Sequence, residues 1–210
     1  AGAAAVINLV GVLKGDFDAV HRQGAANVAS AAKSAGAKCL VQVSAIGADA
    51  GSPSAYGKSK GQAEQAVRDS FPTATILRPS IIFGREDQFI NRFANLIRML
   101  PVLPVIGGGT KFQPVFVGDV AHAVAAVVRD PAAHSGKTYE LGGPDVMTMK
   151  EINSWIAKST GRHRAMIDVP DNISALLATL TGWLPGAPIT HDQWLMLQKD
   201  NIVEAKSKGL

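Results

Sequence analysis

The segment KCLVQVSAIG, residues 38–47, decides the fold class that this sequence predicts. It contains the apolar run C-L-V-Q-V and changes to mostly small residues from Ser44 onward. A short, nearly continuous apolar run is typical of a strand that is buried on both faces inside a parallel sheet. Parallel strands need crossover connections, so helices are expected on either side of this segment.

Both neighbouring segments carry the signals of a helix. Residues 16–35 repeat apolar side chains at helical spacing and end before Gly36, a common C-terminal stop. Residues 54–70 follow a Ser-Pro turn and end before Pro72. Two further apolar runs lie beyond these helices, AVINLVG at 5–11 and TATILRPSIIFG at 73–84. The alternation of strands and helices predicts an α/β fold built on a Rossmann-type parallel sheet.

The chain changes character at about residue 86. Residues 87–100 have the spacing of an amphipathic helix, and residues 101–119 are rich in Pro and Gly. We therefore expect two domains. Residues 1–86 would be the C-terminal half of a Rossmann domain, and residues 87–210 a smaller mixed α/β lobe whose later segments return to the sheet.

Cap signals mark helices in the second part of the chain. Asp119 precedes the apolar run 120–130 and is expected to be the N-cap of that helix. Thr148 and Glu151 have the spacing of a capping box at the start of another helix. Three more elements are expected, a strand at 137–143 and helices at about 171–182 and 190–200.

Composition and charge exclude several classes of protein. The formal net charge is +4, but Lys and Arg are scattered and do not alternate with aromatic residues, so nucleic acid is not an expected partner. Cys39 is the only cysteine, which rules out a disulfide within these 210 residues and a Cys-rich metal site. The histidines share no ligand spacing with carboxylates, so no metal site is expected. No run reaches roughly 18 apolar residues, so no transmembrane segment is expected.

Tyr56 and Lys60, in SPSAYGKSK, are the candidate chemical groups. Residues four apart on a helix share a face, so the two side chains should project together. A phenol has an ordinary pKa of ~10, and a neighbouring ammonium lowers that pKa. Ser44, at a strand end, is placed to hydrogen-bond a substrate oxygen while Tyr56 acts as general acid or base. The plainer alternative is two neighbours on an amphipathic helix, with Lys58 as a solvated charge.

Three of the predicted strands place residues on one rim of the sheet. Gly11, Ser44 and Pro79 fall at or just after the ends of these strands. Ligands of parallel α/β sheets bind beyond the carboxyl ends of the strands. A binding site is therefore expected along this rim.

The motifs VINLVG, VSAIGA, YGKSK and LRPSIIFG resemble, in order and spacing, the extended or atypical short-chain dehydrogenases/reductases. This family is also called the NAD-dependent epimerase/dehydratase family. The stretches FGREDQFINRF and FQPVFVGDVA are similar to one branch in particular, the nucleotide-binding accessory subunits of respiratory complex I and their alphaproteobacterial relatives. The resemblance covers about residues 5–205.

The resemblance implies a dinucleotide cofactor, NADP(H) or NAD(H), and a role for particular residues. The catalytic triplet would be Ser44, Tyr56 and Lys60. Besides Tyr56 and Lys60, the cofactor-binding residues would form two groups, the strand-end segment Asn8, Leu9, Val10 and Gly11 and the segment Pro79, Ser80 and Ile82 over the nicotinamide end.

Two departures from the family pattern qualify these roles. The Gly-rich turn G-x-x-G-x-x-G, which brings the diphosphate to a helix N-terminus, is absent from the sequence. About 70–80 residues of the usual N-terminal half are missing with it, and we expect the sequence to be part of a longer protein. His21 stands where many relatives have Asn, which puts a water-relay mechanism in doubt. The plainer reading of His21 is a packing residue.

The favoured function is an NAD(P)-binding protein similar to the complex I accessory subunit, with the dinucleotide mainly stabilising the fold. The apolar segments LLATLTGWLPGAP and WLMLQ would help it to dock on a large partner near a membrane. The implied location is cytoplasmic, peripheral on the inner face of a bacterial inner membrane, or on the matrix side in a mitochondrion. Two alternatives stay open. One is an active NAD(P)-dependent oxidoreductase or sugar-nucleotide epimerase/dehydratase, and the other is an interaction module without nucleotide.

Overall fold

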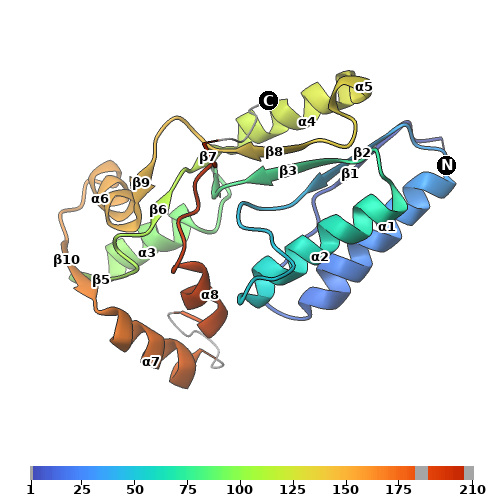
Figure 1. Cartoon of the computed structure of the whole chain (residues 1–210). Helices are drawn as coiled ribbons and strands as arrows, with labels where there is room; N and C mark the ends of the chain where they lie inside the picture. The colour runs from blue at the N-terminus through green and yellow to red at the C-terminus, as the bar shows by residue number, and fades with distance from the viewer. Residues whose placement is uncertain (1, 183–188, 206–210) are drawn as a thin grey trace. The chain divides into compact units, whose positions relative to one another are not determined.

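A computed structural model describes residues 2–182 and 189–205 of the chain (Figure 1). The chain forms two compact units, each discontinuous in sequence. The sheet unit contains Ala1–Ser80, Val117–Gly142 and Val203–Leu210, and the second unit contains Ile81–Phe116 and Gly143–Ile202. Part of the apolar segment LLATLTGWLPGAP, including Trp183, lies outside the described residues.

The sheet unit is built on four parallel strands. Their order is β1–β2–β3–β8, and their bounds are Ala5–Asn8, Cys39–Val43, Thr75–Pro79 and Thr138–Leu141. The predicted α/β fold with a parallel sheet is therefore confirmed. The strands are shorter than the apolar runs that predicted them. The run 73–84 in particular divides, since β3 ends at Pro79 and the later part of the run forms β4 (Ile82–Phe83) in the second unit.

Helices cover both faces of this sheet (Figure 1). On one face lie η1 (Asp18–Gln23), α1 (Gly24–Ser34) and α2 (Ala55–Ser70), and on the other lies α4 (Val117–Arg129), which leads to the short α5 (Pro131–His134). The alternation of side chains along β2 explains the two layers. Leu40 packs with residues of α1 and α2, whereas Cys39 and Val41 pack with Ala123 and Val127 of α4.

The helix predicted over 16–35 differs from the observed one in its first turns. Residues Asp18–Gln23 form a π-helix, and the α-helix begins only at Gly24. A π-helical turn contains an extra residue, and such turns are frequent at functional sites. Apolar periodicity alone does not distinguish the two kinds of helix.

The second unit combines short strands with an apolar helical core. It contains α3 (Ile90–Met99), α6 (Met149–Ser159), α7 (Asp171–Thr181) and α8 (His191–Met196). Its strands pair as β5 (Val102–Ile106) with β10 (Ala165–Val169), β4 with β7 (Val115–Phe116), and β6 (Lys111–Phe112) with β9 (Met147–Thr148). The fully buried Ile97, Leu103, Ile152 and Ile156 form the centre of its core.

The predicted caps have different outcomes. The capping box is confirmed, because the Thr148 hydroxyl accepts the Glu151 N–H and the Glu151 carboxylate accepts the Thr148 N–H. The prediction that Asp119 is an N-cap is wrong, because α4 begins two residues earlier, at Val117. Asp119 instead lies in the first turn, where a negative charge favours the positive end of the helix dipole.

No helix in the described part of the chain has both the length and the apolar composition that a membrane span requires.

The core of the second unit gives a stability test on a single helix. Ile97 is fully buried on α3, whereas Met99, two residues later, is 78% exposed. We expect Ile97→Ala to lower the free energy of unfolding by about 2–5 kcal/mol, because it leaves a cavity. Met99→Ala should change it by less than about 0.5 kcal/mol. Urea unfolding of both variants measures the difference, and equal losses would contradict this description of the core.

Candidate functional site

The carboxyl ends of the four parallel strands define the candidate site, on the rim where the sequence predicted it. β1 ends at Asn8, β2 just before Ser44, and β3 at Pro79. Asn8 is buried, and its amide group donates to Gln42 Oε1 at 2.8 Å. Its Oδ1 accepts the Val10 N–H at 3.1 Å. Asn8 therefore shapes the turn beyond β1 from within.

The turn after β1 is open and apolar. Leu9 is 68% exposed and Val10 is 59% exposed. A Cβ atom added at Gly11 would lie 3.6 Å from His21 Nε2 and 3.9 Å from Lys60 Nζ. The backbone at Gly11 is thus close to the Lys60 ammonium, and the structure brings these two predicted residues together.

Helix α2 positions both candidate chemical groups near its N-terminus. Ser54 caps the helix by accepting the Gly57 N–H, so Tyr56 lies in the first turn and Lys60 one turn later. Lys60 is only 5% exposed, and its Nζ donates to the carbonyl oxygen of Val43 at 3.0 Å. Among the described residues this carbonyl is its only hydrogen-bond acceptor. An ammonium has three N–H donors, so two remain for a ligand.

Electrostatics at the pair differ from the sequence-based expectation. Burial lowers the pKa of Lys60, and the neighbouring Glu64 carboxylate partly opposes this shift. Burial raises the pKa of Tyr56 above its ordinary value. The lowered phenol pKa expected from Lys60 is therefore not found in this structure, where burial is the cause that acts on Tyr56.

The Ser44 hydroxyl was predicted to face a substrate oxygen, but it hydrogen-bonds a carboxylate of the protein. The hydroxyl donates to Glu64 Oε1 at 2.5 Å, and both residues are buried. Arg78 donates to the same carboxylate through Nε at 2.9 Å and Nη2 at 2.7 Å. Glu140 lies 3.9 Å from Arg78 Nη1. The hydrogen bond to Glu64 raises the pKa of Arg78 despite its partial burial.

This buried cluster changes what Ser44 can do. To reach a substrate oxygen, its hydroxyl would have to leave a charged acceptor, and hydrogen bonds to charged groups are stronger than neutral ones. Glu64 was not among the predicted site residues. Its position one turn after Lys60, on the same helix face, was the signal available in the sequence.

The remaining predicted residues lie in two places. Pro79 is buried at the end of β3, and the Ser80 N–H donates to the carbonyl oxygen of Leu141 at 2.9 Å, which extends the sheet by one step. Ile82 belongs to β4, in the second unit.

His21 is a neighbour of Tyr56; in the sequence it stands at the family's Asn position, and its plainest reading there was a packing residue. Its ring stacks on Phe17, with centroids 5.5 Å apart, and meets the Tyr56 ring edge-on at 5.6 Å. Phe17 also meets Tyr56 edge-on, at 6.1 Å. Two aromatic rings, those of Phe17 and His21, therefore pack against the phenol ring of Tyr56.

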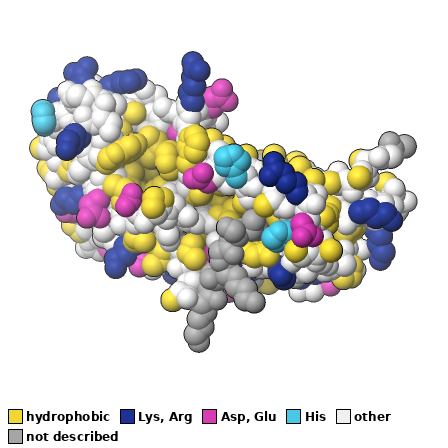
Figure 2. All heavy atoms as spheres, turned by 90° about the horizontal axis from the view of Figure 1, so that it is seen from above, with side chains coloured by type: hydrophobic (Ala, Val, Ile, Leu, Met, Phe, Trp, Pro, Cys, Tyr) yellow, Lys and Arg dark blue, Asp and Glu magenta, His cyan; other side chains and the backbone are white. Residues whose placement is uncertain are grey.

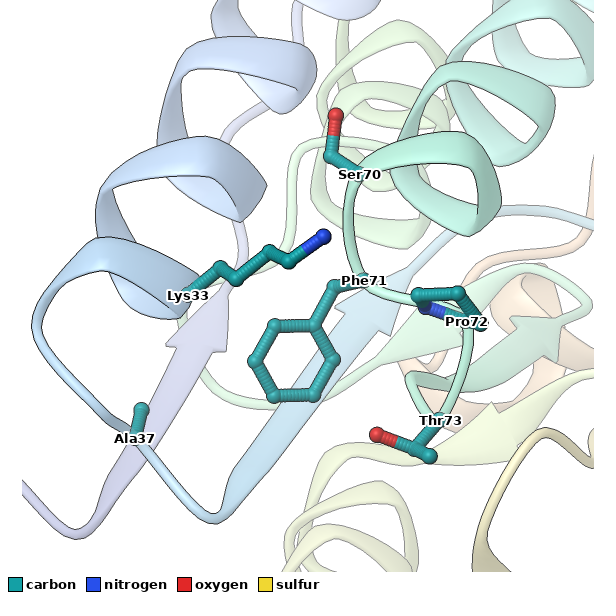
Figure 3. Close-up of a pocket in the computed structure, with 6 residues that line it drawn as sticks. All are labelled: Lys33, Ala37, Ser70, Phe71, Pro72 and Thr73. Atoms are coloured by element: carbon teal, nitrogen blue, oxygen red, sulfur yellow. The ribbon is translucent and has the colours of Figure 1, made fainter.

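A hollow elsewhere on the sheet unit is not this site. It is lined by Lys33, Ala37, Ser70, Phe71, Pro72 and Thr73 (Figure 3). Ala37 and Thr73 precede β2 and β3, so the hollow lies at the amino ends of the strands, the edge opposite the candidate site. Its volume of about 220 Å³ is below the size usual for small-molecule sites.

Across the described residues, no group of three or more His, Cys, Asp or Glu side chains is arranged to hold a metal ion.

The curated proteins that the chain resembles include a mitochondrial NADH dehydrogenase subunit and a reductase. The chain is 43% identical over 153 residues to the mitochondrial "NADH dehydrogenase [ubiquinone] 1 alpha subcomplex subunit 9" of Arabidopsis thaliana, covering 70% of this chain and 38% of that protein. It is 32% identical over 174 residues to the ceramide reductase of Caulobacter vibrioides, covering 81% of this chain and 54% of that protein. The chain thus spans about half or less of the length of these relatives.

Solved structures show the same fold. A dTDP-glucose 4,6-dehydratase from Streptomyces venezuelae, with NAD bound, superposes with a TM-score of 0.69 at 21% identity, covering 80% of this chain and 61% of that one. At family level, residues 16–176 match the model described as the RmlD substrate binding domain. By this match, the chain belongs to the RmlD substrate-binding-domain family, among the extended short-chain dehydrogenases/reductases.

Proposed function

We propose that this chain holds NAD(P) at the carboxyl edge of its sheet, and that the dinucleotide is mainly structural, in an accessory subunit of respiratory complex I. One observation carries the proposal. The buried Lys60 ammonium keeps donors for a ligand, whereas the Ser44 hydroxyl is bonded to Glu64. These contacts support a site that would bind a cofactor through Lys60 and would have no free Ser44 hydroxyl to polarise a substrate.

The residues present fit the ribose and nicotinamide end of a dinucleotide. Lys60 can donate to ribose hydroxyls, and the absence of a side chain at Gly11 lets backbone and ligand approach closely. The exposed Leu9 and Val10 offer apolar surface at the same strand end. When bound, the dinucleotide supplies hydride chemistry. The protein residues here would hold and orient it.

Two features of the site favour retention of the cofactor over turnover. The raised pKa of Tyr56 keeps its phenol protonated at neutral pH, so it exchanges protons poorly. Ser44 would have to break its bond to Glu64 to assist a reaction. A ligand that binds only the folded protein stabilises it by mass action, and this effect requires no chemistry.

The proposed partner is a large assembly near a membrane. The Arabidopsis relative is named as a subunit of a mitochondrial NADH dehydrogenase. Helix α7 exposes an apolar face at helical spacing, made of Ile173, Leu176, Leu177 and Leu180. Lys and Arg are dispersed over the face shown in Figure 2 and form no continuous stripe, which supports a protein partner over nucleic acid. We place the protein in the cytoplasm against the inner face of a bacterial membrane, or on the matrix side in a mitochondrion.

The second candidate is an active oxidoreductase. Tyr56 and Lys60 stand one turn apart on α2, as the chemistry requires, and one relative is a reductase. In that case Tyr56 would be the acid or base and Lys60 the ribose anchor. The third alternative, an interaction module without nucleotide, predicts that the protein is purified without a dinucleotide.

Identification of the bound nucleotide distinguishes these functions. The complete natural protein is purified and denatured, and the released nucleotide is analysed by chromatography. We expect stoichiometric NADP(H) or NAD(H) that exchanges slowly and is not consumed when carbonyl substrates are added. Rapid redox turnover would support the enzyme, and a protein free of nucleotide would refute the proposal.

Substitutions on α2 test the role of Lys60. We expect Lys60→Ala to lower nucleotide affinity, and with it occupancy, the affinity by at least about 10-fold, since charge-assisted hydrogen bonds are worth about 1.5–3 kcal/mol. Lys58→Ala, an exposed lysine on the same helix, is the matched control and should have no effect. Tyr56→Phe removes one hydroxyl and should reduce occupancy far less than Lys60→Ala. Equal losses in the two site variants would contradict these assignments.

Ser44→Ala tests whether this hydroxyl is structural. The substitution removes a bond to a buried carboxylate, so we expect the free energy of unfolding to fall by about 1.5–3 kcal/mol. Ser30→Ala, at an exposed position on α1, should change it by less than about 0.5 kcal/mol. Nucleotide affinity measured by fluorescence titration should be unchanged in both. A weakened affinity with unchanged stability would show that Ser44 faces the ligand.

A further inference from the structure

We propose that His21 is a positioning residue that holds the strand-end segment Gly11–Val12 against helix α2. The ring is 2% exposed and lies in the π-helix η1. Its Nε2 atom accepts the Val12 N–H at 3.0 Å, and its Nδ1 atom is 2.8 Å from Ser59 Oγ on α2. The inference rests on the proposed function in one respect, because it takes the segment Gly11–Val12 to lie along the bound dinucleotide.

The hydrogen-bond network fixes a single state of the imidazole. The Ser59 hydroxyl donates its proton to the carbonyl oxygen of Tyr56 at 2.8 Å. Ser59 must therefore accept a hydrogen bond from His21, so Nδ1 carries the proton. Since Nε2 accepts the Val12 N–H, this nitrogen is unprotonated. Only the neutral Nδ1–H tautomer satisfies both contacts.

The surroundings of the ring disfavour its charged form. Phe17 stacks on one side of it, and Tyr56 and Ser59 approach it from α2. Lys60 on α2 is the charged group that acts on it, and its charge has the same sign as an imidazolium. Burial, and then the Lys60 charge, lower the pKa of His21 below its usual 6.5.

Protonation of His21 would release the segment. A proton on Nε2 would face the Val12 N–H, so two donors would meet and the bond would be lost. Because the pKa of the folded state is lowered, the unfolded chain takes up a proton first. The stabilisation is complete above about pH 6.5 and is lost as the pH falls toward the folded-state value. In the folded protein the Val12 contact is lost only where His21 itself takes up a proton, at and below its lowered pKa, so binding that depends on the position of Gly11–Val12 should weaken there.

The experiment measures hydrogen exchange of the Val12 amide and nucleotide binding separately, in the complete natural protein, from pH 7.5 down to the pH at which NMR signals of the His21 ring show its protonation. His21→Phe keeps an aromatic ring but has no acceptor, and His21→Gln offers an amide oxygen that does not titrate. We expect His21→Phe to reduce hydrogen-exchange protection at Val12, and the affinity for NADPH and NADH, about 3- to 10-fold at pH 7.5. The natural protein should show the same losses once acidification protonates His21. The Gln variant should be independent of pH, and the exposed His163→Gln should behave like the natural protein.

The outcomes separate this inference from the proposed function. If the natural protein binds no dinucleotide, the proposed function fails, and the Val12 amide still reports on His21. Equal Val12 protection in the natural protein and a folded His21→Phe variant would overturn the inference. A natural protein that keeps its Val12 protection and its affinity after His21 is protonated would overturn it too. If His21→Phe does not fold, the pH series on the natural protein and the His21→Gln variant decide whether His21 positions Gly11–Val12.

Discussion

The ion pair between Glu64 and Arg78 fixes helix α2 on the sheet, and the candidate site depends on it. A buried carboxylate is tolerated only when it is paired and hydrogen-bonded, because an uncompensated buried charge costs several kcal/mol. Glu64 meets this requirement with Arg78 from β3 and Ser44 from the end of β2. The helix turn that carries Tyr56 and Lys60 is thereby held at the carboxyl ends of these strands.

This constraint separates two tasks that a triplet of Ser, Tyr and Lys can share. Lys60 lies close enough to Gly11 to hold a ligand and has donors to spare. Ser44 contributes to the stability of the sheet unit, and the phenol of Tyr56 is held protonated. A cofactor bound here would stabilise the fold, and the same residues would do little to accelerate a reaction. On the proposed function, the motif YGKSK would serve binding more than catalysis.

Much of the sheet unit could be predicted from sequence, because buried parallel strands have nearly continuous apolar sequences. The ends of these runs are marked by residues such as Gly11, Ser44 and Pro79. The direction of the Ser44 side chain could not, since it depends on Glu64 and Arg78, which meet only in the folded protein. The strand β10 was missed because Ala165–Val169 is largely exposed and shows no alternation. The tautomer of His21 likewise depends on Val12 and Ser59, which no local pattern connects to it.

The discontinuity of the two units has a consequence for synthesis on the ribosome. The chain crosses between the units after Ser80, Phe116, Gly142 and Ile202. Strand β8, which covers the outer edge of β3, is therefore translated only after α3 and the strands β4–β7. Until then β3 exposes an unpaired edge, and such edges invite association with other chains. A nascent chain of this protein should need a chaperone most while residues 81–137 emerge.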